Sequence, residues 1–397
     1  MQKLLIDDLN LKGKRVLLRV DFNVPLKNGK VEDDTRIRET IPTIKKVLED
    51  GGIPIIISHL GRPKGKKDPA FSLKPVAETL SRLIEKKVTF LPDCIGPEIE
   101  SKIRAGHRGD IFLLENLRFY KEEEENDPEF ARALASLGDV FVNDAFATAH
   151  RAHASTVGVT KYLKKCAAGY LMAKEIQNLS TILENPRRPF VAVVGGAKIS
   201  TKLPVLKNLL RLVDKLLIGG GLSYTFFKAL GGEIGKSICE EDQIPNAAEI
   251  LQSHYADKKI IFPIDCVVTD SLEKPNRIEV VHWDSIPEEL EGVDIGPKTA
   301  ELFASEILSA RSVLINGPMG VFEVKPFDRG TRAVFEAIVE VTRKGGFTVA
   351  GGGETVEALN KLGFKGMLTH ESTGGGASLE FLEGKTLPGI AALTDKE

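Results

Sequence analysis

Short apolar runs that alternate with segments of helical periodicity predict an α/β protein with two doubly wound, Rossmann-like parallel-sheet domains. A helix is expected to join the domains, with a deep cleft between them. The chain has 397 residues, which is long for a single hydrophobic core, so two domains are expected. The run IPIIIS at 53–58 is almost entirely apolar, as in parallel strands that helices cover on both faces.

The residues at the ends of the apolar runs differ between the two halves. In the first half, the runs at 15–20, 53–58 and 111–116 lead into Asp21, His59 and Arg118. In the second half, similar runs end in the glycine-containing sequences GGAK, GGG, NGP and GGGE. Ligands of open parallel sheets bind outside the carboxyl ends of the strands. One half therefore predicts an anion site made of side chains, and the other a phosphate site made of backbone N–H groups.

The order of elements suggests where the domains begin and end. A first helix is expected after Asp34, a candidate N-cap, with Ile37, Ile41, Ile44 and Leu48 on its apolar face. Helical spacing returns from Met172 to Leu183, and the two prolines of NPRRP end it. We expect an N-terminal domain over 1–170, a connecting helix and hinge over 171–189 and a C-terminal domain over 190–378. The segment 379–397 is expected to pack back on the N-terminal domain.

Composition excludes several classes of partner. The formal net charge is −2, so no global field attracts nucleic acid or an anionic membrane. No apolar run approaches the roughly 20 residues that span a bilayer. The four cysteines lie far apart, which favours reduced and mostly buried thiols in a cytoplasmic protein. The acidic run Glu122–Glu125 is interpreted as solvated surface.

Four arginines lie near predicted strand or helix ends in the first half: Arg36, Arg62, Arg118 and Arg151. Arginine suits bidentate recognition of carboxylate and phosphate, so the set predicts an anion site. The histidines of SHLGRP and AHRAHAS allow two interpretations. They are either general bases or phosphohistidines, or residues that position a substrate by hydrogen bonds. We favour the second interpretation, because direct phosphoryl transfer needs no covalent intermediate.

The second half lacks both the Walker pattern and the dinucleotide pattern. In GGAKISTK, Lys198 and Lys202 are four residues apart, which in a helix places both ammonium groups on one face near its N-terminus. Glycine clusters at 219–221, 351–353 and 374–376 allow a close backbone approach. Together these turns predict a nucleotide site.

The motifs RVDFNVP, SHLGRPKG, ENLRF, DAFATAHRAHAS, GGAKISTK, NGPMGVFE and STGGGASLEFLEGK closely resemble phosphoglycerate kinase. The resemblance runs in order from about Lys12 to Ile390. It implies a glycolytic kinase that reversibly transfers a phosphoryl group from 1,3-bisphosphoglycerate to Mg-ADP, giving ATP and 3-phosphoglycerate. It further implies direct in-line transfer with domain closure and a monomeric enzyme that uses Mg²⁺.

The resemblance also implies roles for individual residues. Arg36, Lys202 and Gly375 would be catalytic, with Gly375 in a glycine-rich helix start at 374–376. The phosphoglycerate side would be bound by Asp21, Asn23, Arg36, His59, Arg62, Arg118 and Arg151. The nucleotide side would be bound by Lys198, Lys202, Gly220, Gly221, Gly292, Asn316, Pro318, Glu323, Gly352, Gly353, Glu354 and Thr355.

Two departures from the family pattern concern the metal. The family usually has aspartate where this chain has Glu354, which the resemblance implies as the metal ligand, and often an acidic residue where it has Thr201. Magnesium demands tight octahedral geometry, so an added methylene matters. Two alternatives stay open. The altered metal position allows a non-catalytic nucleotide- or phosphate-binding protein, and two α/β domains around a cleft would also suit an NAD-dependent dehydrogenase. The missing dinucleotide pattern disfavours the dehydrogenase.

Overall fold

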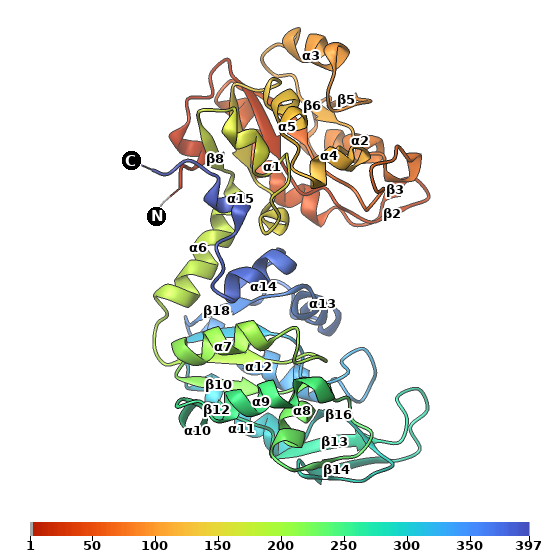
Figure 1. Ribbon diagram of the computed structural model, residues 1–397, viewed down its shortest axis with the longest axis vertical. Helices are drawn as coiled ribbons and strands as arrows, with labels where there is room; N and C mark the ends of the chain where they lie inside the picture. Colours follow the sequence, from red (N-terminus) through yellow and green to blue (C-terminus); the bar gives the residue numbers. More distant parts are fainter. Residues whose placement is uncertain (1–2, 397) are drawn as a thin grey trace. The chain divides into compact units, whose positions relative to one another are not determined.

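The computed structural model describes residues 3–396, which form two compact units (Figure 1). One unit contains the chain up to Ile176 together with the segment from Thr386 onward. The other is Gln177–Lys385. Each unit has its own six-stranded parallel sheet, so the predicted α/β fold with two parallel-sheet domains is confirmed.

The first sheet has the strand order β5-β6-β4-β1-β7-β8. The predicted runs at 15–20, 53–58 and 111–116 form three of these strands. Leu18 of β1 pairs with Ile56 of β4 on one side and Val142 of β7 on the other, which makes β1 the centre of the sheet. The strands are β1 (Arg15–Arg19), β4 (Ile53–Ile57), β5 (Thr89–Leu91), β6 (Phe112–Leu114), β7 (Val140–Asn143) and β8 (Cys166–Ala168).

Helix α1 begins after Asp34, as predicted, although the Asp34 side chain makes no capping bond. Instead, Asp33 Oδ1 accepts from the Thr35 N–H at 2.9 Å. Ile37 and Ile44 of α1 are buried in one core cluster with β1 and α2. The remaining helices of the unit flank the sheet. The helices are α1 (Thr35–Glu49), α2 (Lys74–Ile84), α3 (Pro97–Arg104), α4 (Lys121–Glu124), α5 (Pro128–Ala135) and α15 (Pro388–Ala391), and a small hairpin pairs β2 (Leu26–Lys27) with β3 (Lys30–Val31).

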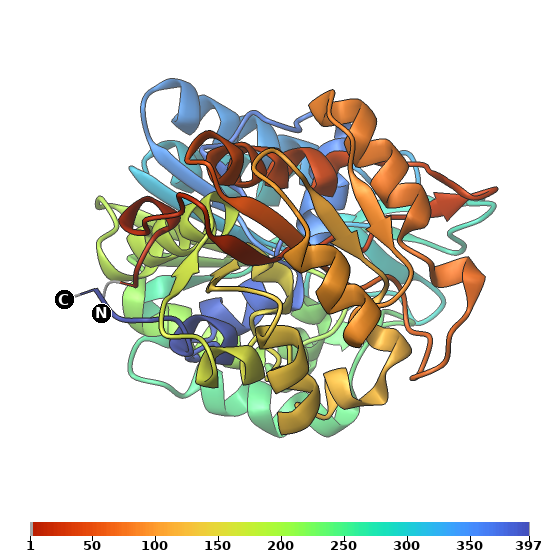
Figure 2. The ribbon, with the colours of Figure 1, turned by 90° about the horizontal axis from the view of Figure 1, so that it is seen from above.

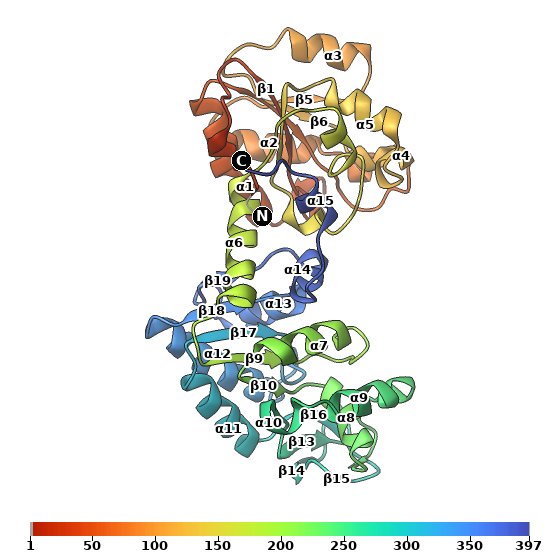
Figure 3. The same ribbon diagram turned by 60° about the vertical axis from the view of Figure 1, so that its left-hand side comes forward.

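The last residues of the chain are part of the first unit. Gly389 N donates to Ala149 O at 2.8 Å, and Thr394 N donates to Cys166 O at 2.9 Å. Leu4 N donates in turn to Thr394 O, so the first and last segments lie side by side (Figures 1, 2 and 3).

The second sheet has the strand order β12-β10-β9-β17-β18-β19, which is 3-2-1-4-5-6 in chain order. This order places the topological switch point between β9 and β17, where ligands of doubly wound sheets bind. Helices α11 and α12 pack on one face of the sheet (Figure 3). The strands are β9 (Phe190–Val194), β10 (Lys215–Ile218), β12 (Ile260–Ile261), β17 (Ser312–Asn316), β18 (Phe347–Ala350) and β19 (His370–Glu371). The helices are α7 (Leu203–Leu212), α8 (Leu222–Ala229), α9 (Ile244–Leu251), α10 (Ala256–Lys259), α11 (Pro297–Leu308), α12 (Arg329–Arg343), α13 (Gly353–Leu362) and α14 (Gly376–Leu382).

A smaller antiparallel sheet in the second unit was not predicted. It has the order β14-β13-β16, with β13 at Asp265–Thr269, β14 at Ile278–His282 and β16 at Glu291–Ile295. Two further short strands, β11 (Glu233–Ile234) and β15 (Ser285–Ile286), pair beside it. Residues along β14 alternate between exposed and half-buried, which is the period of a strand with one solvated face.

The predicted connecting helix is α6, Tyr170–Glu184, which ends just before NPRRP. Met172 and Leu179 on it are fully buried. Among the described residues, no helix is both long and apolar enough to span a bilayer. All four cysteines carry free thiols, and Cys94, Cys166 and Cys266 are buried.

Candidate functional site

The first unit gathers its predicted substrate residues at the carboxyl ends of its strands. Asp21 and Asn23 follow β1, His59 follows β4, and Arg118 lies in the short helix η3 (Leu117–Phe119) after β6. Parallel strands end at the same edge of a sheet, so segments far apart in sequence meet there. We call this surface the cationic face; its residues are Asp21, Asn23, Arg36, His59, Arg62, Arg118 and Arg151.

Short hydrogen bonds fix several side chains of the cationic face. Arg36 Nη1 donates to Asp21 Oδ2 at 2.6 Å, and Asp21 is buried whereas Arg36 is 39% exposed. Gly61 N donates to Asn23 Oδ1 at 2.8 Å, and Arg118 Nη1 donates to Gly61 O at 2.9 Å. Gly61, which follows β4, therefore links the segments that follow β1 and β6. Because Arg36 is held by a buried carboxylate, its guanidinium is oriented before any ligand binds.

His59 is held in one tautomer by Arg19, a residue that sequence reasoning missed. Arg19 Nη2 lies 3.1 Å from His59 Nδ1, and both side chains are buried. A guanidinium has donors and no acceptor, so His59 Nδ1 must accept and the ring hydrogen must lie on Nε2. Burial, with Arg19 next, lowers the pKa of His59 well below its ordinary value. A neutral Nε2–H donor supports the positioning role over a general base or phosphohistidine.

The remaining arginines of the cationic face lie close enough together to affect one another's charge. Burial lowers the pKa of Arg118, the positive charges of Arg151 and Arg62 add to this, and Glu124 opposes it. Arg118 Nε lies 3.5 Å from Glu124 Oε1. Arg151 Nε donates to His150 Nε2 at 3.2 Å. Several cations thus converge on one surface, which favours a bound anion.

The neighbouring His153 gives this unit a predicted pH dependence. Burial, followed by the charges of Arg19 and Arg118, lowers the pKa of His153 to about 4. An unfolded chain protonates histidine near pH 6.5, so between pH 6.5 and 4 only the unfolded state binds the proton. Stability is therefore present above pH 6.5 and is lost as the pH falls through this window, by up to roughly 3 kcal/mol.

The variant His153→Gln is expected to flatten this dependence. Urea unfolding of both proteins at pH 7 and pH 4.5, followed by circular dichroism, measures the difference. Other groups also titrate in this range, so the comparison between variant and parent isolates His153. An equal loss of stability in the two proteins would contradict the assignment.

The acidic run Glu122–Glu125 is not uniformly solvated, and that prediction was wrong for Glu123. The Glu123 side chain is fully buried. Its Oε1 accepts from Ser155 Oγ at 2.5 Å, and its Oε2 accepts from Ser155 N at 3.0 Å. The partners come from a segment 32 residues later in the chain. The run of neighbouring glutamates in the sequence gave no sign of this pairing.

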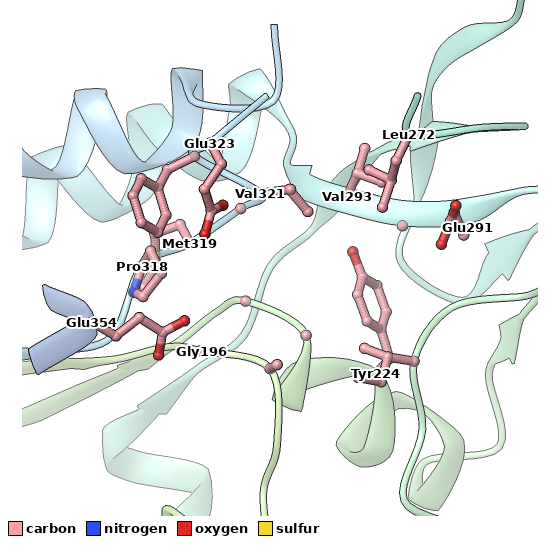
Figure 4. Close-up of a pocket in the computed structure, with 17 residues that line it drawn as sticks. Gly196, Tyr224, Leu272, Glu291, Val293, Pro318, Met319, Val321, Glu323 and Glu354 are labelled. Carbon is pink, nitrogen blue, oxygen red and sulfur yellow. The ribbon is translucent and has the colours of Figure 1, made fainter. Parts of the chain in front are cut away.

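The second unit contains a cavity of about 310 Å³ at its topological switch point (Figure 4). Figure 4 shows Glu323 and Glu354 on one side of this cavity, and Leu272 and Glu291 on the opposite side. Gly196 N, just beyond β9, donates to Pro318 O, just beyond β17, at 2.9 Å. We call it the glycine-lined cavity, and its predicted residues are Gly220, Gly221, Gly292, Pro318, Glu323 and Glu354.

Lys202 and Asn316 form a polar pair at the strand ends near this cavity. Lys202 Nζ donates to Asn316 Oδ1, and Asn316 Nδ2 donates to Gly351 O at 2.9 Å. Burial lowers the pKa of Lys202, while the charge of Glu354 opposes that shift. A partly desolvated ammonium group interacts strongly with anions, because little solvent screens it.

The predicted helical spacing of Lys198 and Lys202 was wrong. Helix α7 begins only at Leu203, with Lys202 as its N-cap, and Lys198 lies in the preceding loop. Lys202 is buried whereas Lys198 is exposed. Pro204, in the first turn of α7, was the available signal, since proline favours a helix start. The loop is tied instead by Ser200, whose N–H and hydroxyl donate to Glu240 at 2.9 and 2.6 Å.

Glu354, the predicted metal ligand, lines the cavity beside Lys202. A Cβ placed on Gly196 would lie 3.2 Å from Glu354 Oε2 and 3.5 Å from Lys202 Cε, so both side chains flank this glycine. Burial raises the pKa of Glu354, and Lys202 opposes the shift. Within the described residues, no three metal-ligating side chains cluster. One or two carboxylates that share the ion with nucleotide phosphates suit Mg²⁺, so Glu354 fits that mode.

Two further glycine turns lie at helix starts, and the one at 374–376 was predicted to do so. Gly352, with φ 89°, precedes α13, and Gly375, with φ 53°, precedes α14. Positive φ values favour glycine at both positions. Gly353 is the first residue of α13, where amide donors are available to phosphate. Thr355 is less suited than predicted, because its buried hydroxyl already donates to Gly351 O and accepts from Gly317 N.

The amides of the 374–376 turn are not all available. Gly374 N already donates to Ser372 Oγ at 3.3 Å. Gly375 and Gly376 remain at the start of α14, as the sequence predicted.

Sequence reasoning missed the apolar lining of the cavity. Tyr224 of α8, Ile238, Leu272 and Met319 belong to it. In Figure 4 the Tyr224 hydroxyl points from α8 toward β16, where Val293 lies. These residues carry no recognisable spacing, because they come from separate elements that the second unit brings together.

Gly292 is predicted to control the space for a bound base. A Cβ added to Gly292 would overlap the Tyr224 ring and hydroxyl. In Gly292→Ala the ring must move, so we expect ADP binding to weaken roughly tenfold, the cost of mild overpacking. Isothermal titration calorimetry measures this. The double variant Gly292→Ala, Tyr224→Ala removes the overlap and should recover part of the affinity. Unchanged binding in the single variant would show that this glycine does not border the base.

Comparisons with known proteins agree with the resemblance seen in the motifs. The family profile "Phosphoglycerate kinase" matches residues 6–385. The phosphoglycerate kinase of Chloroherpeton thalassium is 54% identical over 396 residues and covers 100% of both chains. That of Chlorobaculum tepidum is 52% identical over 399 residues, again with full coverage of both.

Solved structures give the same result. The structure of phosphoglycerate kinase from Coxiella burnetii matches with a TM-score of 0.91 at 43% identity, covering 98% of each chain. The crystal structure of the Pyrococcus horikoshii enzyme matches with a TM-score of 0.82 at 34% identity, also covering 98% of each. With matches over its full length and a common fold, the chain belongs to the phosphoglycerate kinase family of phosphotransferases.

Proposed function

We propose that this enzyme reversibly transfers a phosphoryl group from 1,3-bisphosphoglycerate to Mg-ADP, giving ATP and 3-phosphoglycerate. The observation that carries the proposal is the contrast between the two strand-end sites in a member of this family. One site is a convergent cationic face, and the other is a glycine-lined cavity beside a buried lysine. The NAD-dependent dehydrogenase alternative is set aside by the family assignment.

On the phosphoglycerate side, Asp21, Asn23 and His59 would contact the glycerate, with His59 donating from Nε2. Arg62, Arg118 and Arg151 would clamp the phosphate that stays on the substrate. Arg36 would face the phosphoryl group in transfer. Arginine forks suit these anionic groups.

On the nucleotide side, Gly220, Gly221 and Gly292 would border adenine, while Asn316, Pro318 and Glu323 would line the remainder. Lys198 and the N–H groups at Gly352 and Gly353 would hold phosphates. Lys202 would reach the transferred group, and the N–H of Gly375 would stabilise its oxygens. Glu354 would hold Mg²⁺, which supplies neutralisation of phosphate charge when it is bound.

Transfer in a single in-line step requires the two bound ligands to meet. We therefore propose that the units close about the segment 171–189, which would also exclude water. Direct transfer needs no enzyme nucleophile, in keeping with a His59 whose Nδ1 already accepts a hydrogen bond. We propose further that the enzyme acts as a monomer in the cytoplasm.

A coupled assay with Mg-ATP and 3-phosphoglycerate tests the proposal. The rival is a non-catalytic nucleotide-binding protein, which the altered metal position Glu354 makes conceivable. Turnover that depends on both substrates supports the kinase. Binding of nucleotide without turnover supports the rival and contradicts our proposal.

Glu354→Gln is expected to weaken Mg²⁺ binding to the ADP complex by roughly tenfold or more, because the variant loses a charged oxygen ligand. Titration of the variant–ADP complex with Mn²⁺ as a spin probe measures this without turnover. Glu357→Gln, one turn along α13 where Glu357 pairs with Lys361 at 2.9 Å, is the matched control. Equal metal affinity in all three proteins would remove Glu354 from the metal site.

A further inference from the structure

Beneath the cationic face, three buried polar side chains, those of Arg19, Ser155 and Glu123, are joined by hydrogen bonds. The proposed mechanism does not use them. Arg19 Nε donates to Ser155 Oγ at 2.8 Å, and Ser155 Oγ donates to Glu123 Oε1 at 2.5 Å. Arg19 is 1% exposed, and Ser155 and Glu123 are fully buried. Buried ionic groups need partners, because the interior offers no solvent to compensate them. Glu123 and Arg19 provide this compensation through one shared hydroxyl group.

The hydrogen-bonded series Arg19–Ser155–Glu123 contacts two different parts of the cationic face. At one end, Arg19 donates to His59 Nδ1 and to Val20 O. At the other end, Glu123 holds the segment that follows Arg151. Ser155 N donates to Glu123 Oε2 at 3.0 Å, and Ala154 N donates to the Glu123 carbonyl at 2.9 Å. Glu123 thus fastens this segment and sets the environment of Arg19 at the same time.

The direction of each hydrogen bond gives Glu123 a defined role. Arg19 only donates, so Ser155 Oγ must accept from it and use its own hydrogen for Glu123. Both Glu123 oxygens accept, which an ionised carboxylate satisfies. The charge of Glu123 then raises the pKa of Arg19 against the stronger effect of burial. Without that charge, Asp21 is the remaining carboxylate that stabilises the charge of Arg19, the donor that fixes the His59 tautomer.

We propose that Glu123 is a positioning residue of the phosphoglycerate site: through Ser155 and Arg19 it keeps His59 as the Nε2–H tautomer and holds the segment bearing Arg151. The inference rests on the proposed function of the cationic face. Glu123 touches no substrate in this scheme and acts through the residues that do. The short helix α4 therefore belongs to the support of the site.

The variant Glu123→Gln keeps the size of the side chain and removes its charge. We expect the KM for 3-phosphoglycerate to rise roughly tenfold or more, the scale of one hydrogen bond to a charged group, with the KM for ATP within about twofold of the parent. Glu125→Gln makes the same charge change on an exposed neighbour and should leave both values unchanged. A merely structural defect would raise both KM values, or it would lower stability without a selective rise in the KM for 3-phosphoglycerate.

A second readout needs no ligand. Side-chain ¹⁵N spectra of labelled histidine distinguish the two tautomers, with His59→Gln used to assign the signal. We expect a single Nε2–H form in the parent and a mixture, or the other tautomer, in Glu123→Gln. If Glu123→Gln does not fold, Ser155→Ala breaks the same connection while retaining the carboxylate, and it should show the same changes in smaller measure.

The outcomes separate the two proposals. A parent protein with no measurable use of 3-phosphoglycerate defeats the proposed function, whatever the spectra show. A parent that uses 3-phosphoglycerate, with variants that keep both its KM and the His59 spectrum, overturns the role of Glu123 alone.

Discussion

Lys202→Ala is expected to lower kcat by roughly 10²–10³-fold, the loss found when one preorganised transition-state donor is removed. Lys202 is 9% exposed; its ammonium group donates to Asn316, and its side chain flanks Gly196, which lines the glycine-lined cavity. Lys198 is exposed in the preceding loop and does not share the buried position of Lys202. The charge that develops on the transferred group would then lack its nearest counter-charge.

Steady-state kinetics in both directions measure this loss, with kcat separated from the KM values. The matched control is Lys207→Ala on the same helix, whose ammonium group pairs with Glu249 at 2.9 Å and is largely solvated. That variant should turn over normally. Near-parental kcat in Lys202→Ala would show that the lysine binds nucleotide without acting in the transfer.

Arg36→Ala is expected to have an effect of similar size on the phosphoglycerate side, a roughly 10²–10³-fold lower kcat. Arg36 is oriented by Asp21 at 2.6 Å, so its guanidinium needs no reorganisation when charge develops. Arg36→Lys should recover little, because a lysine cannot reproduce the fork that binds Asp21 and a phosphoryl oxygen together.

Pre-steady-state transfer from bound ATP gives the cleanest test of Arg36, because product release does not enter. Arg38→Ala serves as the control, since Arg38 lies on the same helix and pairs with Asp34 on the exposed side. Equal burst rates for Arg36→Ala and the control would exclude Arg36 from the chemical step.

The strand ends were predictable because their signals are local. A short apolar run followed by a charged residue or by glycine marks the carboxyl end of a parallel strand, and β1, β4, β9 and β17 all follow that rule. The family resemblance added the identity of the ligands. The register of β1 with β4 and β7 then brings Asp21 and His59 to one edge, as the parallel arrangement requires.

The residues that escaped prediction depend on contacts distant in sequence. Glu123 sits in a run of glutamates, where local charge predicts solvent, yet its partners Arg19 and Ser155 lie far away along the chain. Tyr224 enters the cavity because α8 packs beside β16. The start of α7 could have been predicted, because Pro204 marks it in the sequence. The prediction was wrong because it relied on the spacing of Lys198 and Lys202 instead.

The hydrogen bonds of Gly389 and Thr394 with Ala149 and Cys166 have a consequence for synthesis on the ribosome. The chain emerges from its N-terminus, so the second unit, Gln177–Lys385, is complete before the residues from Thr386 onward appear. The unit that begins first is therefore the one finished last. Until then, the Ala149 carbonyl, two residues before Arg151, lacks the N–H group of Gly389 that it accepts from in the finished fold.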